Sequence, residues 1–135
     1  MSLGHFGPRG DLPDADLRSA SAIDADDVAA LLSEMGYPCS TSEARERIRL
    51  IGGNDRQALV LARSGGRVCG LIALDFMYYL PLGSTTCRIT ALVVTSESQG
   101  NGLGRQLLKE AERRARFAGA ARLELTSGSQ RADAH

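Results

Sequence analysis

The chain has 135 residues, the length of one domain, which leaves no room for a second core of comparable size. Sixteen basic residues balance sixteen acidic ones, so the overall charge points neither to nucleic acid nor to an anionic membrane as a partner. With 43% hydrophobic residues the composition is that of a globular protein, and no apolar run approaches the roughly 18 residues that a membrane span needs.

The first part of the chain predicts a leader, a strand and two helices. Residues 1–15 are rich in Gly, Pro and Asp and lack periodicity, so we interpret them as a flexible leader and place one domain over residues 16–135. A short strand over 16–20 precedes a helix that Asp24 caps and Gly36 ends. Ser40 and Glu43 fit a capping box that opens the second helix, which ends at the glycine pair 52–53. The apolar stripe of the first helix comprises Val28, Leu31, Leu32 and Met35.

The middle and end of the chain predict four strands and a third helix. Apolar and β-branched runs over 57–63, 68–80 and 85–94 are separated by short turns, which favours an antiparallel meander. A third helix follows the loop over 95–102 and ends at Gly119. The apolar stripe of this helix comprises Leu103, Leu107, Leu108, Ala111, Ala115 and Ala118. A last strand over 122–126 follows the helix, which therefore permits a parallel crossover between the strands on either side of it. This order predicts an α/β (α+β) fold with a mixed, mostly antiparallel sheet flanked by helices.

The cysteines and histidines argue against a disulfide framework and against a metal site. The three cysteines are odd in number and far apart, and Cys69 and Cys87 lie in apolar runs that predict buried free thiols. Free thiols fit a reducing compartment, so we expect a cytoplasmic protein. The only histidines are His5 and His135, at opposite ends of the chain, which makes a histidine-based metal site improbable.

Three glycines at alternate positions separate the third of these strands from the helix, in the segment Gln99-Gly100-Asn101-Gly102-Leu103-Gly104. The first N–H groups of a helix have no partner within the helix, and the helix dipole adds partial positive charge there. Glycines let the backbone approach a ligand and turn several N–H groups inward. The segment therefore predicts an anion site suited to a phosphate or pyrophosphate, with Arg105 as a charged neighbour. A plain tight turn is the alternative.

Two common nucleotide motifs do not fit this segment. A Walker loop ends in Gly-Lys-Ser/Thr, whereas Arg105 and Gln106 follow the last glycine here. A dinucleotide-binding fingerprint has the spacing G-x-G-x-x-G, whereas this one is G-x-G-x-G. Glu124 follows the glycines at about the sequence distance of the acidic residue that binds the ribose in such proteins, but it lies inside its strand rather than at the strand end. ATP or NAD is therefore a weaker candidate ligand.

The segment resembles a known family, the GNAT-type N-acetyltransferases, which carry Gln/Arg-x-x-Gly-x-Gly/Ala between their fourth strand and third helix. Gln99, Gly102 and Gly104 fill this pattern. The run Ile89-Thr90-Ala91-Leu92-Val93-Val94 is similar to the family's fourth strand, and the order of elements also matches. The resemblance spans nearly the whole chain, although its motif covers only about residues 89–108.

The resemblance implies acetyl-CoA as cosubstrate and an amine as acceptor. By this analogy, backbone amides from Gly100 to Arg105 hold the pyrophosphate, and the strand backbone pairs with the pantetheine arm like an added strand. Ser127, Ser129 and Arg131 are further candidates for contact with the cofactor, or they cap the next helix. The implied cofactor-binding residues are Leu92, Val93, Val94, Gln99, Gly100, Asn101, Gly102, Leu103, Gly104 and Arg105.

The sequence assigns no catalytic residue. The family often places a carboxylate on its fourth strand as general base, but Thr90 and Ala91 occupy that region. Asp75, Tyr78 and Tyr79 are substitutes, although strand or rim positions suit them better. Glu97 is interpreted as a solvated loop charge. The same interpretation applies to three helix residues that have the charge to attract a cationic acceptor: Glu34, Glu43 and Glu46.

The chain stops where the resemblance implies a fourth helix, with a tyrosine general acid, and two further strands. The domain over 16–135 is therefore expected to be incomplete, with its last strand as a bare sheet edge that invites a homo-oligomer. Two alternatives to an active enzyme remain open. One is an acetyl-CoA-binding module without turnover, and the other is a nucleotide-binding regulatory domain.

Overall fold

Five strands lie side by side in the order in which they occur along the chain. The structure, a computed structural model, describes residues 15–126. Strands β1 (Asp16–Ser19), β2 (Gln57–Ser64), β3 (Arg67–Tyr79) and β4 (Ser84–Val94) form antiparallel pairs. Strand β5 (Arg122–Leu125) joins the outer side of β4 in parallel. The predicted meander and the predicted parallel crossover are both confirmed.

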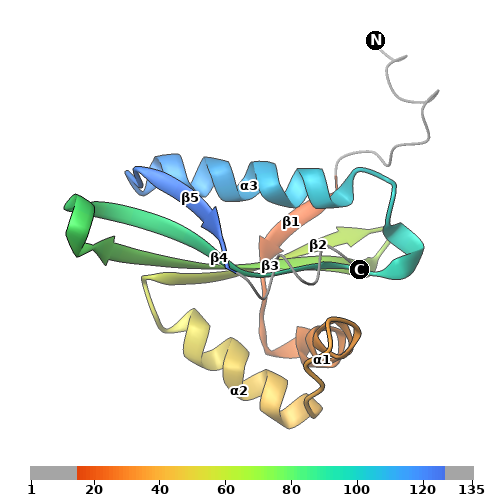
Figure 1. Ribbon diagram of the computed structural model, residues 1–135. Helices are drawn as coiled ribbons and strands as arrows, with labels where there is room; N and C mark the ends of the chain where they lie inside the picture. Colours follow the sequence, from red (N-terminus) through yellow and green to blue (C-terminus); the bar gives the residue numbers. More distant parts are fainter. Residues whose placement is uncertain (1–14, 127–135) are drawn as a thin grey trace.

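Helices cover both faces of this sheet. Helices α1 (Ala25–Glu34) and α2 (Thr41–Gly52) lie on one face, and α3 (Leu103–Phe117) lies on the other (Figure 1). Alternate residues of a strand point to opposite faces, so the sheet supplies two separate cores. The core toward α3 contains Val60, Ile72, Leu74, Ile89, Leu103 and Leu107, and the core toward α1 and α2 contains Val28, Leu31, Ala44, Ile48, Leu61 and Leu71. No helix in the described part is long and apolar enough to cross a membrane.

Local capping explains where the helices begin and end. The capping box of α2 is confirmed: the Ser40 N–H donates to Glu43 Oε1 at 2.8 Å, and the Glu43 N–H donates to Ser40 Oγ at 3.0 Å. Helix α3 ends at Phe117, and Gly119, whose φ of 75° places it in the left-handed region, lies just beyond its C-cap residue Ala118. The assignment of Ala118 to the apolar stripe of α3 is wrong, because Ala118 follows the last helical residue and is exposed.

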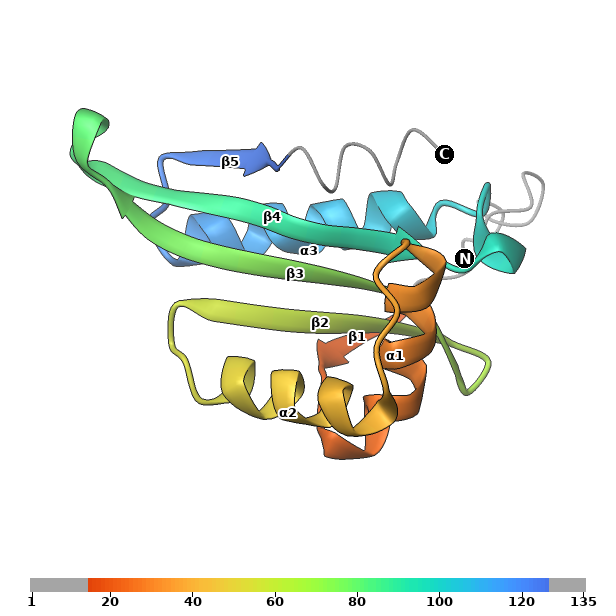
Figure 2. The same cartoon turned by 60° about the horizontal axis from the view of Figure 1, so that its bottom comes forward.

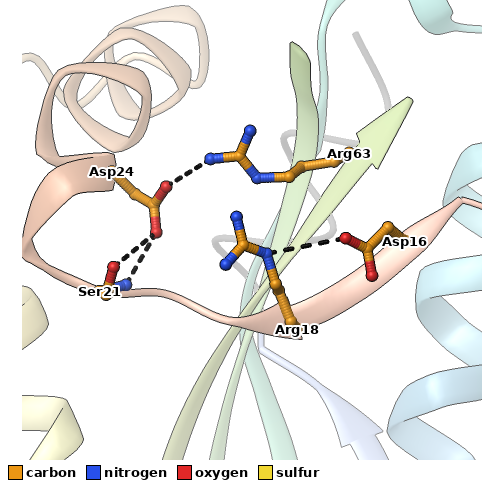
Figure 3. Close-up of polar contacts among 5 residues, drawn as sticks. All are labelled: Asp16, Arg18, Ser21, Asp24 and Arg63. Atoms are coloured by element: carbon orange, nitrogen blue, oxygen red, sulfur yellow. Dashed lines mark hydrogen bonds and ion pairs between the residues drawn. The ribbon is translucent and has the colours of Figure 1, made fainter. Parts of the chain in front are cut away.

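The start of α1 differs from the prediction. Asp24 precedes the helix, but its carboxylate does not cap it. Instead Asp24 Oδ2 accepts the Ser21 N–H at 2.8 Å, and Oδ1 accepts Arg63 Nη2 of β2 at 2.8 Å (Figure 3). Asp24 is 1% exposed. Burial by itself raises the pKa of Asp24, but the hydrogen bond from Ser21 and the Arg63 guanidinium outweigh it, so the pKa is lowered. The carboxylate ties α1 to the sheet.

Strand β3 approaches β4 and α3 closely at Gly70. A Cβ built there lies 3.0 Å from the Val93 carbonyl oxygen and 3.2 Å from Leu107 Cδ1. Because one of these atoms is backbone and the other belongs to a fully buried side chain, neither has room to move. Gly70 therefore permits α3 to lie directly over the end of β4.

We predict that Gly70→Ala destabilises the protein by about 2 kcal/mol, because overpacking a close contact forces backbone shifts. Urea unfolding measures the change. Gly52→Ala is the matched control, since nothing lies within 4 Å of a Cβ at Gly52, and its free energy of unfolding should not decrease. Equal losses in the two variants would contradict the packing argument.

We predict that Asp24→Asn destabilises the protein by about 2 kcal/mol near neutral pH, because it leaves the Arg63 guanidinium without its counter-charge. A lowered pKa means that the carboxylate stabilises the fold above the ordinary carboxyl pKa of 3.8, and that this contribution fades as the pH falls below it. Urea unfolding of both proteins at about pH 7 and about pH 2.5, below the ordinary carboxyl pKa, should therefore show a smaller difference at the lower pH. A difference independent of pH would contradict the role of the charge.

Candidate cofactor and acceptor site

The pairing between strands β4 and β5 ends halfway along β4. The last register pair joins Ile89 to Leu125, and the Thr126 N–H donates to the Ile89 carbonyl oxygen at 3.1 Å. Beyond this point β4 continues to Val94, while β5 has ended (Figure 2). Within residues 15–126, the outer side of the second half of β4 therefore has no strand partner.

A β-bulge at Thr90 coincides with this parting. Ala73 pairs with Ala91 and Leu74 pairs with Ile89, so Thr90 has no opposite residue on β3. The extra residue shifts the alternation of side chains, which is why Ile89 and Leu92 both pack toward α3. The bulge thus resets the direction of every residue from Ala91 onward.

The backbone direction of these residues follows from one hydrogen bond at the strand end. The Thr95 N–H donates to the Cys69 carbonyl oxygen at 2.8 Å, so Thr95 faces β3. Because backbone groups alternate along a strand, Val93 also faces β3, where it pairs with Leu71. The N–H and C=O groups of Leu92 and Val94 consequently point toward the open side of β4.

The glycine segment presents a series of unpaired backbone donors. Two N–H groups from Gln99 to Gln106 have acceptors among the described residues: the Asn101 N–H donates to the Ser98 carbonyl oxygen at 3.4 Å, and the Gln106 N–H donates to the Gly102 carbonyl oxygen at 3.1 Å. No described residue accepts the other N–H groups, which belong to Gln99, Gly100, Gly102, Leu103, Gly104 and Arg105. Gly100 and Gly102 have φ values of 86° and 82°, a conformation open to glycine that turns the chain into α3.

The start of α3 adds electrostatic attraction for an anion. The first turn carries no acidic residue, and buried Leu103 and Leu107 fix it against the sheet. Gln99 Nε2 donates to the Val94 carbonyl oxygen at 3.2 Å and so joins the glycine segment to the end of β4. Glu97 is exposed and forms an ion pair with Arg67 at 3.6 Å, as expected of a solvated loop charge. The helix N-terminus is therefore free to attract a phosphate group.

The buried thiol nearby is not a nucleophile. Cys87 is fully buried on β4, and burial, followed by the charge of Asp75, raises its pKa to about 11. A neutral thiol without access to solvent cannot attack a thioester. The expected burial of Cys69 is only partly met, because it lies half-buried at a second bulge between β2 and β3. Across the described residues, no cluster of His, Cys, Asp and Glu is suited to hold a metal ion.

A row of charged side chains crosses β3, β4 and β5 on the face opposite α3. Cys87 and Ile89 pack toward α3, so Arg88 between them points to the other face. Arg88 Nε donates to Glu124 Oε1 at 3.0 Å, and Arg122 Nη2 donates to Glu124 Oε2 at 2.8 Å. Asp75 is the register partner of Arg88 on β3. Arg88 and Arg122 were not among the candidate residues predicted from the sequence. A charged residue inside a β-branched run, such as Arg88, is the pattern that marks a polar site on a strand.

The remaining residues predicted from the sequence lie either within the described residues or outside them. Tyr79 lies beneath the Arg122 guanidinium, 5.2 Å from carbon to ring centre, whereas Tyr78 is exposed at the end of β3. Glu43 and Glu46 are engaged with Ser40 and Arg49, so they are helix-surface charges. Other predictions lie outside the described residues: the leader up to residue 14, Ser127, Ser129, Arg131 and both histidines.

Comparison with known proteins identifies the family. Residues 25–135 match the model of the acetyltransferase (GNAT) family. Aminoalkylphosphonate N-acetyltransferase from Salmonella typhimurium is 31% identical over 136 residues, which cover 92% of this chain and 81% of that protein.

Solved structures agree on the fold. A protein from Bacillus halodurans described as a transcriptional regulator superposes with a TM-score of 0.78 at 24% identity, covering 89% of this chain and 86% of the other. A GNAT family acetyltransferase from Staphylococcus aureus superposes with a TM-score of 0.76 at 22% identity, covering 84% and 87%. Of the functions that the sequence left open, these comparisons support N-acetyl transfer. The chain belongs to the GNAT family of N-acetyltransferases.

Proposed function

We propose that this enzyme takes its acetyl group from acetyl-CoA, bound across the glycine segment and the open side of β4. The observation that carries the proposal is the series of N–H groups from Gln99 to Arg105 at the start of α3, of which only that of Asn101 has an acceptor among the described residues. Such groups, together with the helix dipole, suit the pyrophosphate of the cofactor. Arg105 is exposed in the first helical turn and adds a positive charge.

The open side of β4 suits the pantetheine arm. Its two amides can pair with the outward N–H and C=O groups of Leu92 and with the outward N–H of Val94, as an added strand would. The Val94 carbonyl oxygen already accepts Gln99 Nε2. The backbone groups of Val93 face β3, so we propose that the arm pairs with the residues on either side of Val93 and not with Val93 itself. The arm then leads from the pyrophosphate toward the point where β4 and β5 separate, and the thioester lies there.

The reaction at that point is direct transfer. The neutral amine of the acceptor attacks the thioester carbonyl, the new C–N bond forms, and the C–S bond breaks as the CoA thiolate leaves. The amine gives up one proton, and the thiolate takes one up. The Leu92 N–H is the first outward donor beyond the bulge, and we assign it to the oxyanion that develops on the carbonyl. Positioning of the two reactants supplies the rest of the rate enhancement.

The acceptor is proposed to be the amine of a small molecule. The relative from Salmonella typhimurium is named for aminoalkylphosphonates, which makes these the first acceptors to test. Free Cys39, Cys69 and Cys87 fit a reducing cytoplasm, where we propose that the protein works. β5 forms one edge of the described sheet, and through it we propose that two copies associate.

We predict that Gly102→Ala weakens acetyl-CoA binding about tenfold or more in isothermal titration calorimetry. The φ of Gly102 is 82°, which an alanine adopts only with strain, so the N–H groups of the segment lose their common direction. S-acetylpantetheine, which lacks the pyrophosphate, should bind much more weakly than acetyl-CoA to the unchanged protein.

Gly119→Ala is the matched control, because Gly119 has a φ of 75° but lies at the other end of α3. It should lower stability and leave the affinity for acetyl-CoA unchanged. The proposal fails if Gly102→Ala binds acetyl-CoA as tightly as the unchanged protein does, or if both variants lose affinity equally.

We predict that Cys87→Ala retains acetyl transfer within a fewfold, because a buried thiol with a pKa of about 11 takes no part in the chemistry. Thiol release from acetyl-CoA in the presence of an acceptor measures the rate, and mass spectrometry of the protein detects any acetylated cysteine. Loss of activity in a folded variant, with acetylation of Cys87 in the parent, would contradict direct transfer.

A further inference from the structure

Arg88 is held at one end of its guanidinium and free at the other. Its Nε donates to Glu124 Oε1 at 3.0 Å, and no described residue accepts from its two Nη groups. The side chain is 38% exposed and Glu124 is 31% exposed, so water or a ligand can reach them. A guanidinium whose terminal N–H groups are free presents the planar, paired donors that bind phosphonate or carboxylate oxygens.

The neighbours of Arg88 keep it in place. Glu124 is shared, because its Oε2 accepts Arg122 Nη2 at 2.8 Å while its Oε1 holds Arg88. Arg122 in turn lies over the Tyr79 ring at 5.2 Å. Since Glu124 already has a second cationic partner, a ligand that binds Arg88 does not leave this carboxylate unpaired. The row is therefore organised before any ligand arrives, which reduces the entropic cost of binding.

The position of Arg88 relates it to the reaction centre. Arg88 and Glu124 form the register pair immediately before Ile89 and Leu125, where β4 and β5 separate. Leu92 lies four residues further along β4, about 13 Å at the rise of an extended strand. The bulge at Thr90 shortens this interval. An arginine side chain and an acceptor of two or three carbons can together span it.

We infer that Arg88 binds the anionic group of the acceptor, and that the acceptor is a short amine carrying a phosphonate or carboxylate at its other end. The terminal N–H groups of Arg88 hold the anion on the sheet face opposite α3. The alkyl chain then directs the amine along β4 toward the thioester.

This inference rests on the proposed function, but binding tests it separately from turnover. The measurement is calorimetric titration of 2-aminoethylphosphonate into protein saturated with CoA. Ethanolamine is the arm that lacks an anionic group, and β-alanine is the arm that distinguishes carboxylate from phosphonate recognition. We expect the unchanged protein to bind one or both of the anionic amines at least tenfold more tightly than ethanolamine.

Arg88→Gln should lower the affinity for the preferred anionic amine about tenfold or more and leave CoA affinity unchanged. Arg88→Lys should recover only part of the loss, because a lysine lacks the planar donor pair. Arg116→Gln is the matched control, since it removes the same charge from an exposed position on α3, and it should bind as the unchanged protein does.

Glu124→Gln separates recognition from a merely structural role. If the row serves only to clamp β5 to β4, Arg88→Gln and Glu124→Gln should weaken acceptor binding alike. If Arg88 binds the anion, Glu124→Gln should retain binding within a fewfold while Arg88→Gln loses it. The inference is overturned by equal losses in these two variants, by unchanged binding in Arg88→Gln, or by no preference for an anionic amine. Acceptor binding that depends on Arg88, without any thiol release, would instead refute the proposed function.

Discussion

The parallel pairing of β4 with β5 ends at Ile89, and this loss of a hydrogen-bonding partner leaves unpaired the backbone polar groups on which the proposed site depends. A backbone N–H or C=O group that has lost its strand partner must find another one, in water or in a ligand. The bulge at Thr90 fixes which residues are affected, because it turns Leu92 and Val94 outward and leaves Val93 paired with β3.

The packing of α3 against β3 and β4 joins this open side to the proposed anion site in the glycine segment. Leu103 and Leu107 are fully buried, and Gly70 lets Leu107 approach the sheet backbone. Gln99 bridges the start of α3 to the carbonyl of Val94. The glycine segment and the open side of β4, which we propose hold the pyrophosphate and the pantetheine arm, therefore belong to one rigid unit. Under this proposal their spacing does not have to be established again when acetyl-CoA binds, which favours preorganised catalysis.

Two arginine–carboxylate pairs show how burial separates structure from recognition. Asp24 is almost fully enclosed and satisfied by Ser21 and Arg63, so its carboxylate fixes α1 to β2. Arg88 and Glu124 also form a hydrogen-bonded ion pair, through Nε of the arginine, but both side chains remain about one-third exposed. Solvent screens the second pair, so it adds little to stability. Its value lies in holding a guanidinium where its unused donors remain accessible.

The sequence by itself determined the elements and the glycine-rich segment for which we propose an anion site. Turn residues, caps and apolar periodicity act locally, so the meander, the capping box of Ser40 and Glu43 and the glycine-rich start of α3 were all predictable. Only the tertiary structure decided the rest, because those features depend on residues far apart in the chain. The pairing of Asp24 with Arg63, the unpaired side of β4 at Leu92, and the meeting of Arg88 with Glu124 each arise from strand register, which no local pattern specifies.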